Sequence, residues 1–229
     1  MIPSQHFCLN LRICEFFYEE EETRKIITEH LEREITILDL FTHASGLSYG
    51  FFEDDPIDRL YNQKLVFEKL KNLSLQQAIK IISSIPLRFQ PGKYFRYSYG
   101  LDALGRLIEV LSGGSLDEFL NKAIFQPLEM TDTAFYVPEE KLNRFAKIYS
   151  YNEGNKLQLD NTPSIIEKYD RSYRFLSGGA GLVSTIKDFF NFTLMLLNRG
   201  KFKEKRLLCP EIIDLMTRNH LKIITQLLN

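Results

Sequence analysis

The sequence predicts an α+β fold in which helices dominate and the strands are few and short. Apolar residues recur at three- and four-residue steps in several segments, a spacing typical of amphipathic helices. Only brief runs bounded by turn residues are left for strands. The chain has 229 residues, of which 44% are hydrophobic, so it contains ample apolar sequence for a core. We expect residues 1–229 to form a single domain that begins with an irregular segment at 1–34.

The N-terminal segment shows no clear hydrophobic period, although residues 13–18 could form a short strand. Glu19–Glu22 is a run of four acids, which suggests either a cation site or a solvated loop. The loop is favoured because the Asp, Asn and Gly pattern of a cation-binding loop is missing. The first ten residues lack a basic start and a long apolar run, so we expect no signal peptide and, by default, a cytoplasmic protein. No apolar run is long enough to span a membrane.

Thr36 is predicted to cap a short helix that runs through Phe41. Asp39, at the third helical position, would complete a capping box, and Gly46 is expected to end the segment. His43 could serve Ser45 as a general base. Adjacent helical positions do not face each other, however, and no acid is placed in the sequence to orient the ring. A histidine that hydrogen-bonds the helix end is therefore the favoured interpretation.

Further helices are predicted along the middle of the chain. Residues 51–72 read as a helix-containing excursion at the border of a cleft, and Ser74 and Ser115 each resemble an N-cap. Glycines or prolines end the runs that follow. The apolar faces are predicted to consist of Leu75, Ala78, Ile79 and Ile82, then Leu101, Leu104, Leu107, Ile108 and Leu111, and then Phe119, Leu120, Ala123 and Ile124.

The C-terminal half is predicted to contain strands and two more helices. Short strands are expected at 135–137, 146–151 and 157–159, with a hairpin turn at 152–155. The glycine run at 178–181 suggests either a phosphate cradle or close backbone packing. Packing is favoured, because the lysine of a phosphate-binding loop and the full dinucleotide fingerprint are missing. A long helix over 185–199 and a last helix from Pro210 to about Arg218 complete the prediction.

Tyr97, Ser98 and Tyr99 form a hydroxyl-rich triplet where a loop is predicted to enter a helix. Pro91 and Gly92 precede it and suit a type II turn, because proline fixes φ and glycine tolerates a positive φ. Short polar groups at such a junction can point into a cleft while the helix holds them still. The triplet is therefore the candidate functional site.

Four collinear segments resemble the serine β-lactamase and penicillin-binding-protein superfamily, most closely the branch of class C enzymes and family VIII carboxylesterases. The segments are residues 35–47, 89–113, 125–133 and 178–185, and the similar region covers about 35–220. The resemblance implies a β-lactamase/transpeptidase-like fold. It also implies that this chain is mostly the helical part of that fold, with much of the central antiparallel sheet missing.

The resemblance implies acyl transfer without a metal or an organic cofactor. In this family a Ser-x-x-Lys pair supplies the nucleophile, a tyrosine relays the proton, and a Lys-Thr-Gly strand lines the cleft. The resemblance carries Tyr97 onto the catalytic tyrosine. Tyr99 stands where β-lactamases of this branch usually have asparagine, which favours ester hydrolysis and makes Tyr99 a candidate substrate-binding residue.

The expected nucleophile motif and Lys-Thr-Gly strand are not found, and we expect a partial domain cut at both ends and inactive as written. The sequence contains one Ser-x-x-Lys, at Ser184 and Lys187. It could supply a nucleophile and a base at a helix start. A capping box from Thr185 to Asp188 explains the same residues structurally, and the family uses this segment as a loop-to-helix junction. An active hydrolase that uses Ser184 and Lys187 therefore remains an alternative, as does a non-catalytic binding or regulatory module.

Charge and cysteine usage limit the partners. The 29 basic and 30 acidic residues nearly cancel, so we expect no nucleic-acid partner. The spacing of Cys8, Cys14 and Cys209 matches no metal site, and free thiols in a reducing compartment are expected. The resemblance implies a small-molecule ester or amide as the substrate of the full-length parent.

Overall fold

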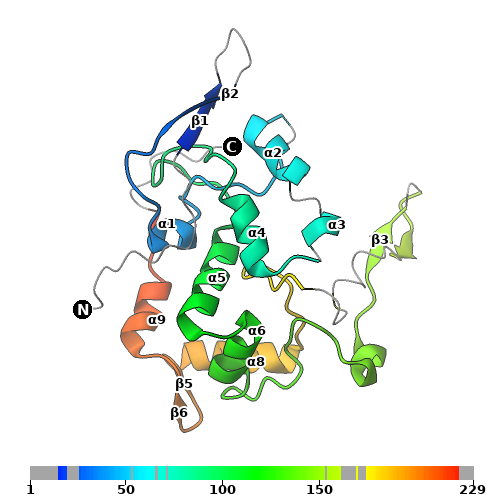
Figure 1. Ribbon diagram of the computed structural model, residues 1–229. Helices are drawn as coiled ribbons and strands as arrows, with labels where there is room; N and C mark the ends of the chain where they lie inside the picture. Colours follow the sequence, from blue (N-terminus) through cyan, green and yellow to red (C-terminus); the bar gives the residue numbers. More distant parts are fainter. Residues whose placement is uncertain are drawn as a thin grey trace.

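The computed structural model describes residues 15–19, 26–52, 54–64, 67–70, 72–152, 154–160, 169 and 174–221. Helices dominate this part of the chain (Figure 1). The described elements are β1 (Glu15–Glu19), β2 (Ile26–His30), α1 (Ile37–Phe41), α2 (Pro56–Lys64), α3 (Phe67–Leu70), α4 (Leu75–Ile82), α5 (Gly100–Ser112), α6 (Leu116–Leu120), the π-helix η1 (Asn121–Phe125), the 3₁₀-helix η2 (Glu139–Arg144), β3 (Tyr149–Tyr151), β4 (Leu157–Leu159), α8 (Ile186–Leu197), β5 (Lys201–Phe202), β6 (Lys205–Arg206) and α9 (Pro210–Met216).

Helix α5 lies at the centre of the fold, against α1, α4 and α6 (Figure 1). Of the predicted inward face, Leu104 and Leu107 are buried and Leu101 and Ile108 are partly buried against the same cluster. Leu111 was expected to face inward but is 58% exposed, and Ala103, which was not predicted, is buried instead. Gly113 ends the helix with a φ of 74°, a left-handed conformation that costs glycine little. The predicted helix between Leu101 and Leu111 is therefore confirmed, together with its glycine stop.

The cap of α1 forms as the sequence predicts. The Thr36 side chain accepts a hydrogen bond from Asp39 N, and the Asp39 carboxylate accepts one from Thr36 N at 2.8 Å. The predicted stop at Gly46 is wrong, because α1 ends at Phe41. Gly46 instead has a φ of 85° and lies where an added Cβ would overlap the carbonyl oxygen of Phe89, so it lets two loops approach closely.

The described strands form three separate two-stranded antiparallel sheets, β1–β2, β3–β4 and β5–β6. The predicted strands near 13–18 and at 157–159 are found. The run predicted at 146–151 shortens to β3, which starts at Tyr149. No regular strand forms at 135–137, where the described contact is a single bridge between Ala134 and Val183. The β3–β4 hairpin stands away from the helical body on an arm (Figure 1).

The caps of α4 and α6 agree with the predictions, but the face of α6 does not. Ser74 and Ser115 form capping boxes with Gln77 and Glu118. Phe119 and Ala123 were expected to point inward, yet both are exposed. Leu120 and Ile124 of the same predicted face are partly buried and pack on the second core cluster, and the chain continues α6 as the π-helix η1. The last helix, α9, ends at Met216, two residues before the expected end.

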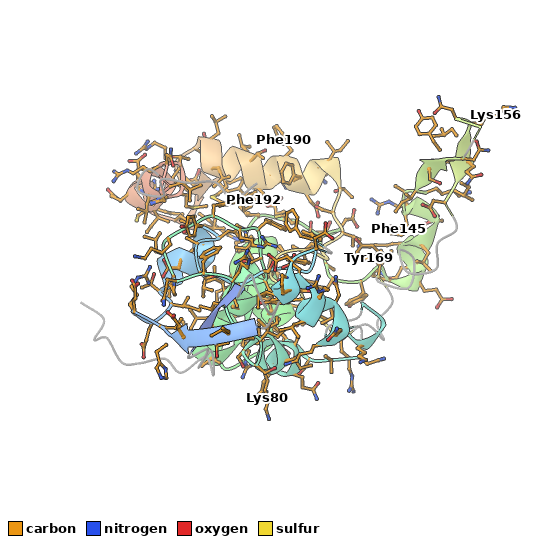
Figure 2. All side chains as sticks on the ribbon, turned by 90° about the horizontal axis from the view of Figure 1, so that it is seen from above. Lys80, Phe145, Lys156, Tyr169, Phe190 and Phe192 are labelled. Atoms are coloured by element: carbon orange, nitrogen blue, oxygen red, sulfur yellow. The ribbon has the colours of Figure 1, made fainter. Side chains whose placement is uncertain are left out.

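The buried side chains form two clusters. The larger surrounds α4 and α5, and a smaller one joins Phe125, Leu128 and Met130 to Met195 and Phe202. Helix α8 contributes only one face to this second cluster. Phe192 points toward the body of the molecule, whereas Phe190 points away from it on the opposite side of the helix (Figure 2).

Candidate active site

Tyr97 lies on the loop that leads into α5, after a tight turn. The carbonyl of Gln90 accepts a hydrogen bond from Lys93 N, and Gly92 has a φ of 84°. This is the geometry of the predicted type II turn. Gly92 N also donates to the carbonyl of Ala44 at 2.7 Å, which fixes the turn to the loop after α1. The turn therefore brings the Tyr97 loop against residues 43–49.

His43 contacts the chain on both sides of Tyr97. Its carbonyl oxygen accepts from Arg96 N at 2.8 Å, and its Nδ1 accepts from Ser98 N at 3.2 Å. The imidazole centroid lies 4.7 Å from the Tyr97 ring centroid. The expectation that the His43 side chain bonds the end of the helix is therefore wrong. His43 has a φ of 55°, and this left-handed backbone turns the side chain away from α1 toward the loop.

The protonation state of His43 follows from these contacts. Because Ser98 N–H donates to Nδ1, this nitrogen carries no proton. Partial burial lowers the pKa of His43 below its ordinary value, so the neutral form is favoured. A neutral imidazole can keep accepting from the Tyr97 loop at physiological pH.

Tyr97 belongs to a stack of five aromatic rings. Tyr61, Tyr99 and Tyr49 follow one another with centroid separations of 5.9 and 4.0 Å and interplanar angles of 12° and 8°. Phe51 and Tyr97 both stack on Tyr49, at 4.8 and 5.6 Å. The stack runs from the core at Tyr61 to the surface at Phe51 and Tyr97, which are 62% and 47% exposed. A buried column therefore supports two exposed rings.

A buried ionic network holds the two loops that carry these rings. Arg96 Nη2 lies 3.0 Å from Asp58 and 3.4 Å from Asp55, and Arg96 Nε donates to Ser48 Oγ at 2.8 Å. Ser48 Oγ in turn donates to the Asp58 carboxylate, which also accepts from Phe52 N. Buried charges need partners of this kind. Arg96 thus links the Tyr97 loop to the loop that carries Tyr49 and Phe51.

The two predicted site residues occupy different environments. The Tyr97 ring reaches the surface. Tyr99 is only 4% exposed, and its ring is sandwiched between Tyr49 and Tyr61. It lies at the N-cap of α5 and supports the stack from below. A role for Tyr99 in substrate binding stays a prediction, and its described contacts are those of a packing residue.

Ser184 and Lys187 are not brought together as a nucleophile and a base. Ser184 Oγ lies 2.8 Å from Thr133 Oγ1, which donates to Asp188 Oδ2 at 2.9 Å. Since the Thr133 proton points to Asp188, Ser184 is the donor to Thr133. Among the described contacts, none joins Ser184 to Lys187. Thr185 accepts from Asp188 N as a helix cap, but the Asp188 carboxylate bonds Thr133 and Asp132 N instead of closing the predicted capping box.

A cavity of about 660 Å³ lies next to Ser184 and away from the Tyr97 loop. Its lining includes Phe135, Phe145 and Asp132. Arg144 and Lys141 pair with the Asp132 carboxylate and hold its pKa far below its usual range. Phe145 stacks edge-on against Tyr169 at the base of the β3–β4 arm (Figure 2). Three charged groups of this cavity, Asp132, Lys141 and Arg144, are therefore engaged with one another.

The glycine run packs closely against α5, as predicted. A Cβ at Gly178 would overlap the carbonyl oxygen of Leu101. Asp102 of α5 accepts a hydrogen bond from Ser177 Oγ at 2.5 Å, and burial raises the pKa of this carboxyl. A carboxylate beside the run opposes a bound phosphate. These contacts favour packing over a phosphate cradle.

The described residues contain no group of three or more His, Cys, Asp or Glu side chains placed to hold a metal ion. No helix in this part of the chain is long and apolar enough to cross a membrane. Cys8 and Cys14 lie outside the described residues, and Cys209 is an exposed free thiol.

The sequence did not indicate Tyr49 as a site residue, nor that His43 bonds the backbone on both sides of Tyr97. Tyr49 lies only two residues after the segment 35–47 that resembles the family. Phe51 was placed at the border of a cleft, but no residue was predicted to contact it. The available signal was the aromatic alternation Tyr49-Gly50-Phe51 next to the aromatic residues of the Tyr97 loop. It does not reveal the stack, because the two loops are more than 40 residues apart in the sequence.

Comparison with known proteins places the chain among related sequences. The sequence profile of the family described as Beta-lactamase matches residues 19–214. The protein Rv1367c of Mycobacterium tuberculosis is 34% identical over 196 residues, which cover 85% of this chain and 46% of that protein. Lovastatin esterase of Penicillium rubens is 35% identical over 193 residues, which cover 82% of this chain and 45% of that protein.

Solved structures give the same picture. Unliganded simvastatin synthase (LovD) from Aspergillus terreus superposes on this chain with a TM-score of 0.73 at 26% sequence identity. The matched region covers 93% of this chain and 50% of the synthase chain. The chain therefore spans about half the length of the relatives that it matches.

Proposed function

The chain belongs to the beta-lactamase family, and we propose that it supplies the Tyr97 wall of a site that hydrolyses esters or amides through an acyl-serine intermediate. The profile match and the superposition on LovD confirm the family resemblance inferred from the sequence. The family contains serine hydrolases and acyltransferases. The esterase among the relatives makes a small-molecule ester the proposed substrate class.

The observation that carries the proposal is the placement of Tyr97. Its phenol is exposed, while its backbone is fixed on both sides by His43 and its ring rests on Tyr49. A group that relays a proton must be reachable by the substrate and must keep its position. Tyr97 meets both conditions, and Ser184, tied to Thr133, does not lie beside it.

We also propose that the 229 residues have no turnover of their own. Acyl transfer needs an activated nucleophile within hydrogen-bond reach of its base. The one Ser-x-x-Lys of the chain does not provide it, because the Ser184 hydroxyl bonds Thr133 and Lys187 is exposed. Purified chain should release no p-nitrophenol from p-nitrophenyl esters above the buffer rate, and no nitrocefin product. Labelling by a fluorophosphonate that disappears in Ser184→Ala would contradict this and support the hydrolase that uses Ser184 and Lys187.

A chimera tests the function itself. Residues 19–214 would replace the matching segment of lovastatin esterase, whose own nucleophile segment is retained. The proposal expects fluorophosphonate labelling and p-nitrophenyl ester turnover by this chimera. A folded and labelled chimera without turnover would overturn the proposal and favour a non-catalytic binding module on the same scaffold.

We propose that residues 1–229 form one partial domain, in which 35–220 is the region that resembles the family. The profile match runs through most of this range, and α1, α4, α5 and α6 share one buried cluster. Limited proteolysis that released a stable piece from within this range would contradict a single domain.

A further inference from the structure

We propose that the exposed rings of Phe51 and Tyr97 form a flat shelf that binds an uncharged, planar aromatic group of the substrate. The shelf rests on the proposed function in that it assigns a substrate class to the same site. It adds a binding role for Phe51 and Tyr49, which no step of the acyl transfer requires.

The arrangement of the rings defines the shelf. Phe51 and Tyr97 are nearly parallel, with an interplanar angle of 9° and centroids 6.1 Å apart. Both stack on Tyr49, and Tyr99 covers the opposite face of Tyr49 at 4.0 Å. The two rings therefore lie side by side as the outer layer of the column. A layer two rings wide is large enough for a fused two-ring ligand to contact both rings.

The shelf is exposed but is held in place. Phe51 is 62% and Tyr97 47% exposed, so the two rings remain accessible to a ligand. The loops that carry them are joined by Arg96, which bonds Ser48 on one side and continues into Tyr97 on the other. A preorganised aromatic surface loses little entropy when a ligand stacks on it. Exposed rings fixed in this way suit stacking recognition.

The charges around the shelf favour a neutral ligand. Arg96 lies over the Phe52 ring, but it pairs with Asp55 and Asp58, and Arg88 pairs with the same Asp55. His43, on the other side of Tyr97, is held neutral by the burial that lowers its pKa. The two arginines and two aspartates pair with one another, so their charges largely cancel beside the shelf and a charged ligand gains little from them. The shelf therefore recognises the flat shape of the ligand rather than its charge.

Binding of 2-naphthol to the purified chain tests the shelf without requiring turnover. The probe is planar and neutral at pH 7, and a Kd of about 1 mM is expected for a ligand of its size. Ligand-observed NMR should show saturable binding that weakens about tenfold in Phe51→Leu and in Tyr97→Leu, because each removes one stacking ring. Phe51→Tyr and Tyr97→Phe keep a ring and should keep binding.

Two controls make the test specific. Tyr151→Leu removes an exposed ring on the β3–β4 arm and should leave the Kd unchanged. Decahydro-2-naphthol, which has a similar size but no flat face, should bind at least about tenfold more weakly than 2-naphthol. Absence of binding, equal affinity for the saturated alcohol, or unchanged binding by a folded Phe51→Leu variant would each overturn the shelf.

The outcomes separate the shelf from the catalytic proposal. If Phe51→Leu weakens 2-naphthol binding while Tyr97→Phe leaves ester turnover by the chimera unchanged, the shelf stands and the catalytic role of Tyr97 fails. If Tyr97→Phe abolishes turnover while Phe51→Leu binds 2-naphthol normally, the shelf fails and the catalytic role stands.

Discussion

At the scale of single residues, His43 couples α1 to the Tyr97 loop through its main chain and its ring. The carbonyl holds Arg96 N and the imidazole holds Ser98 N, so the histidine fixes the peptide units on either side of Tyr97. Protonation of Nδ1 would remove the second of these bonds. The geometry of the proposed site therefore depends on a neutral histidine.

This dependence predicts a pH effect on stability. The pKa of His43 is lower in the folded chain than the ordinary value of about 6.5, so between these two values the unfolded state binds more protons. The contribution of His43 is fully present above about pH 6.5 and is lost as the pH falls through the folded pKa. Urea unfolding between pH 7.5 and 5 should show a smaller loss of stability in His43→Asn, which keeps a δ-position acceptor and tolerates a positive φ. An identical loss in both proteins would contradict the assignment.

Asp188 is a second residue whose role the structure redefines. Its carboxylate is 1% exposed and accepts from Asp132 N at 2.7 Å and from Thr133 Oγ1. It therefore joins the start of α8 to the segment at 131–134, which the expected capping box would not have done.

Replacement of Asp188 should be costly. Asp188→Ala leaves one buried and one partly buried donor without an acceptor and should lower the free energy of unfolding by about 2–4 kcal/mol. The matched change Asp214→Ala removes an exposed ion pair with Arg199 and should cost at most about 1 kcal/mol. Urea denaturation measures both, and equal losses would mean that the Asp188 contacts contribute little.

At the scale of elements, α5 depends on the glycine run that packs on its first turn. Gly178 lies against the backbone of Leu101, and Ser177 donates to Asp102. The sequence predicted both the helix and the close packing, because the glycine stop and the apolar spacing are local signals. It could not show that Asp102 receives Ser177, since that contact spans 75 residues.

Adjacent glycines test this packing directly. Gly178→Ala would place a methyl group in the Leu101 carbonyl and should destabilise the chain by about 1–3 kcal/mol. In Gly179→Ala the added methyl group would lie 3.4 Å from its nearest neighbour, Asp102 Oδ2, an ordinary contact, so stability should change by at most about 0.5 kcal/mol. Thermal unfolding measures both variants. Equal melting temperatures for Gly178→Ala and Gly179→Ala would contradict the close packing of Gly178 on Leu101.

The candidate site shows which elements the sequence could and could not predict. The turn at Pro91-Gly92 and the exposure of Tyr97 follow from local patterns and from the family resemblance. The stack of Tyr49 and Phe51 on Tyr97 depends on a tertiary approach of two loops, and the shift of His43 from the helix end to the loop depends on one positive φ. Neither has a local sequence signal.

At the scale of the whole molecule, several helices present apolar residues to solvent. The exposed residues lie on α1 (Ile37, Leu38 and Phe41), α8 (Ile186, Phe189, Phe190 and Leu197) and α9 (Ile212, Leu215 and Met216). The family resemblance predicted a mostly helical part of the fold with much of the central sheet missing, and uncovered helix faces agree with that prediction. Exposed apolar surface of this kind favours association.

Substitutions on α8 test whether this face drives association. Phe189→Lys with Phe190→Lys replaces rings that are 60% and 58% exposed and should increase the monomer fraction in size-exclusion chromatography without lowering the melting temperature. Phe192→Lys, on the face that packs on the second core cluster, should instead unfold the chain. An unchanged monomer fraction in the double variant would exclude this face as the contact.

The measurement that tests the central claim most directly is kcat/KM for ester hydrolysis by the chimera with and without the Tyr97 hydroxyl. Loss of a positioned proton-transfer group typically costs a factor of about 10²–10⁴. Tyr97→Phe should therefore lower kcat/KM at least about 100-fold through kcat, while Tyr149→Phe on the distant arm should not change it. An equal kcat/KM for Tyr97→Phe and the parent chimera would contradict the assignment of Tyr97 to the chemistry.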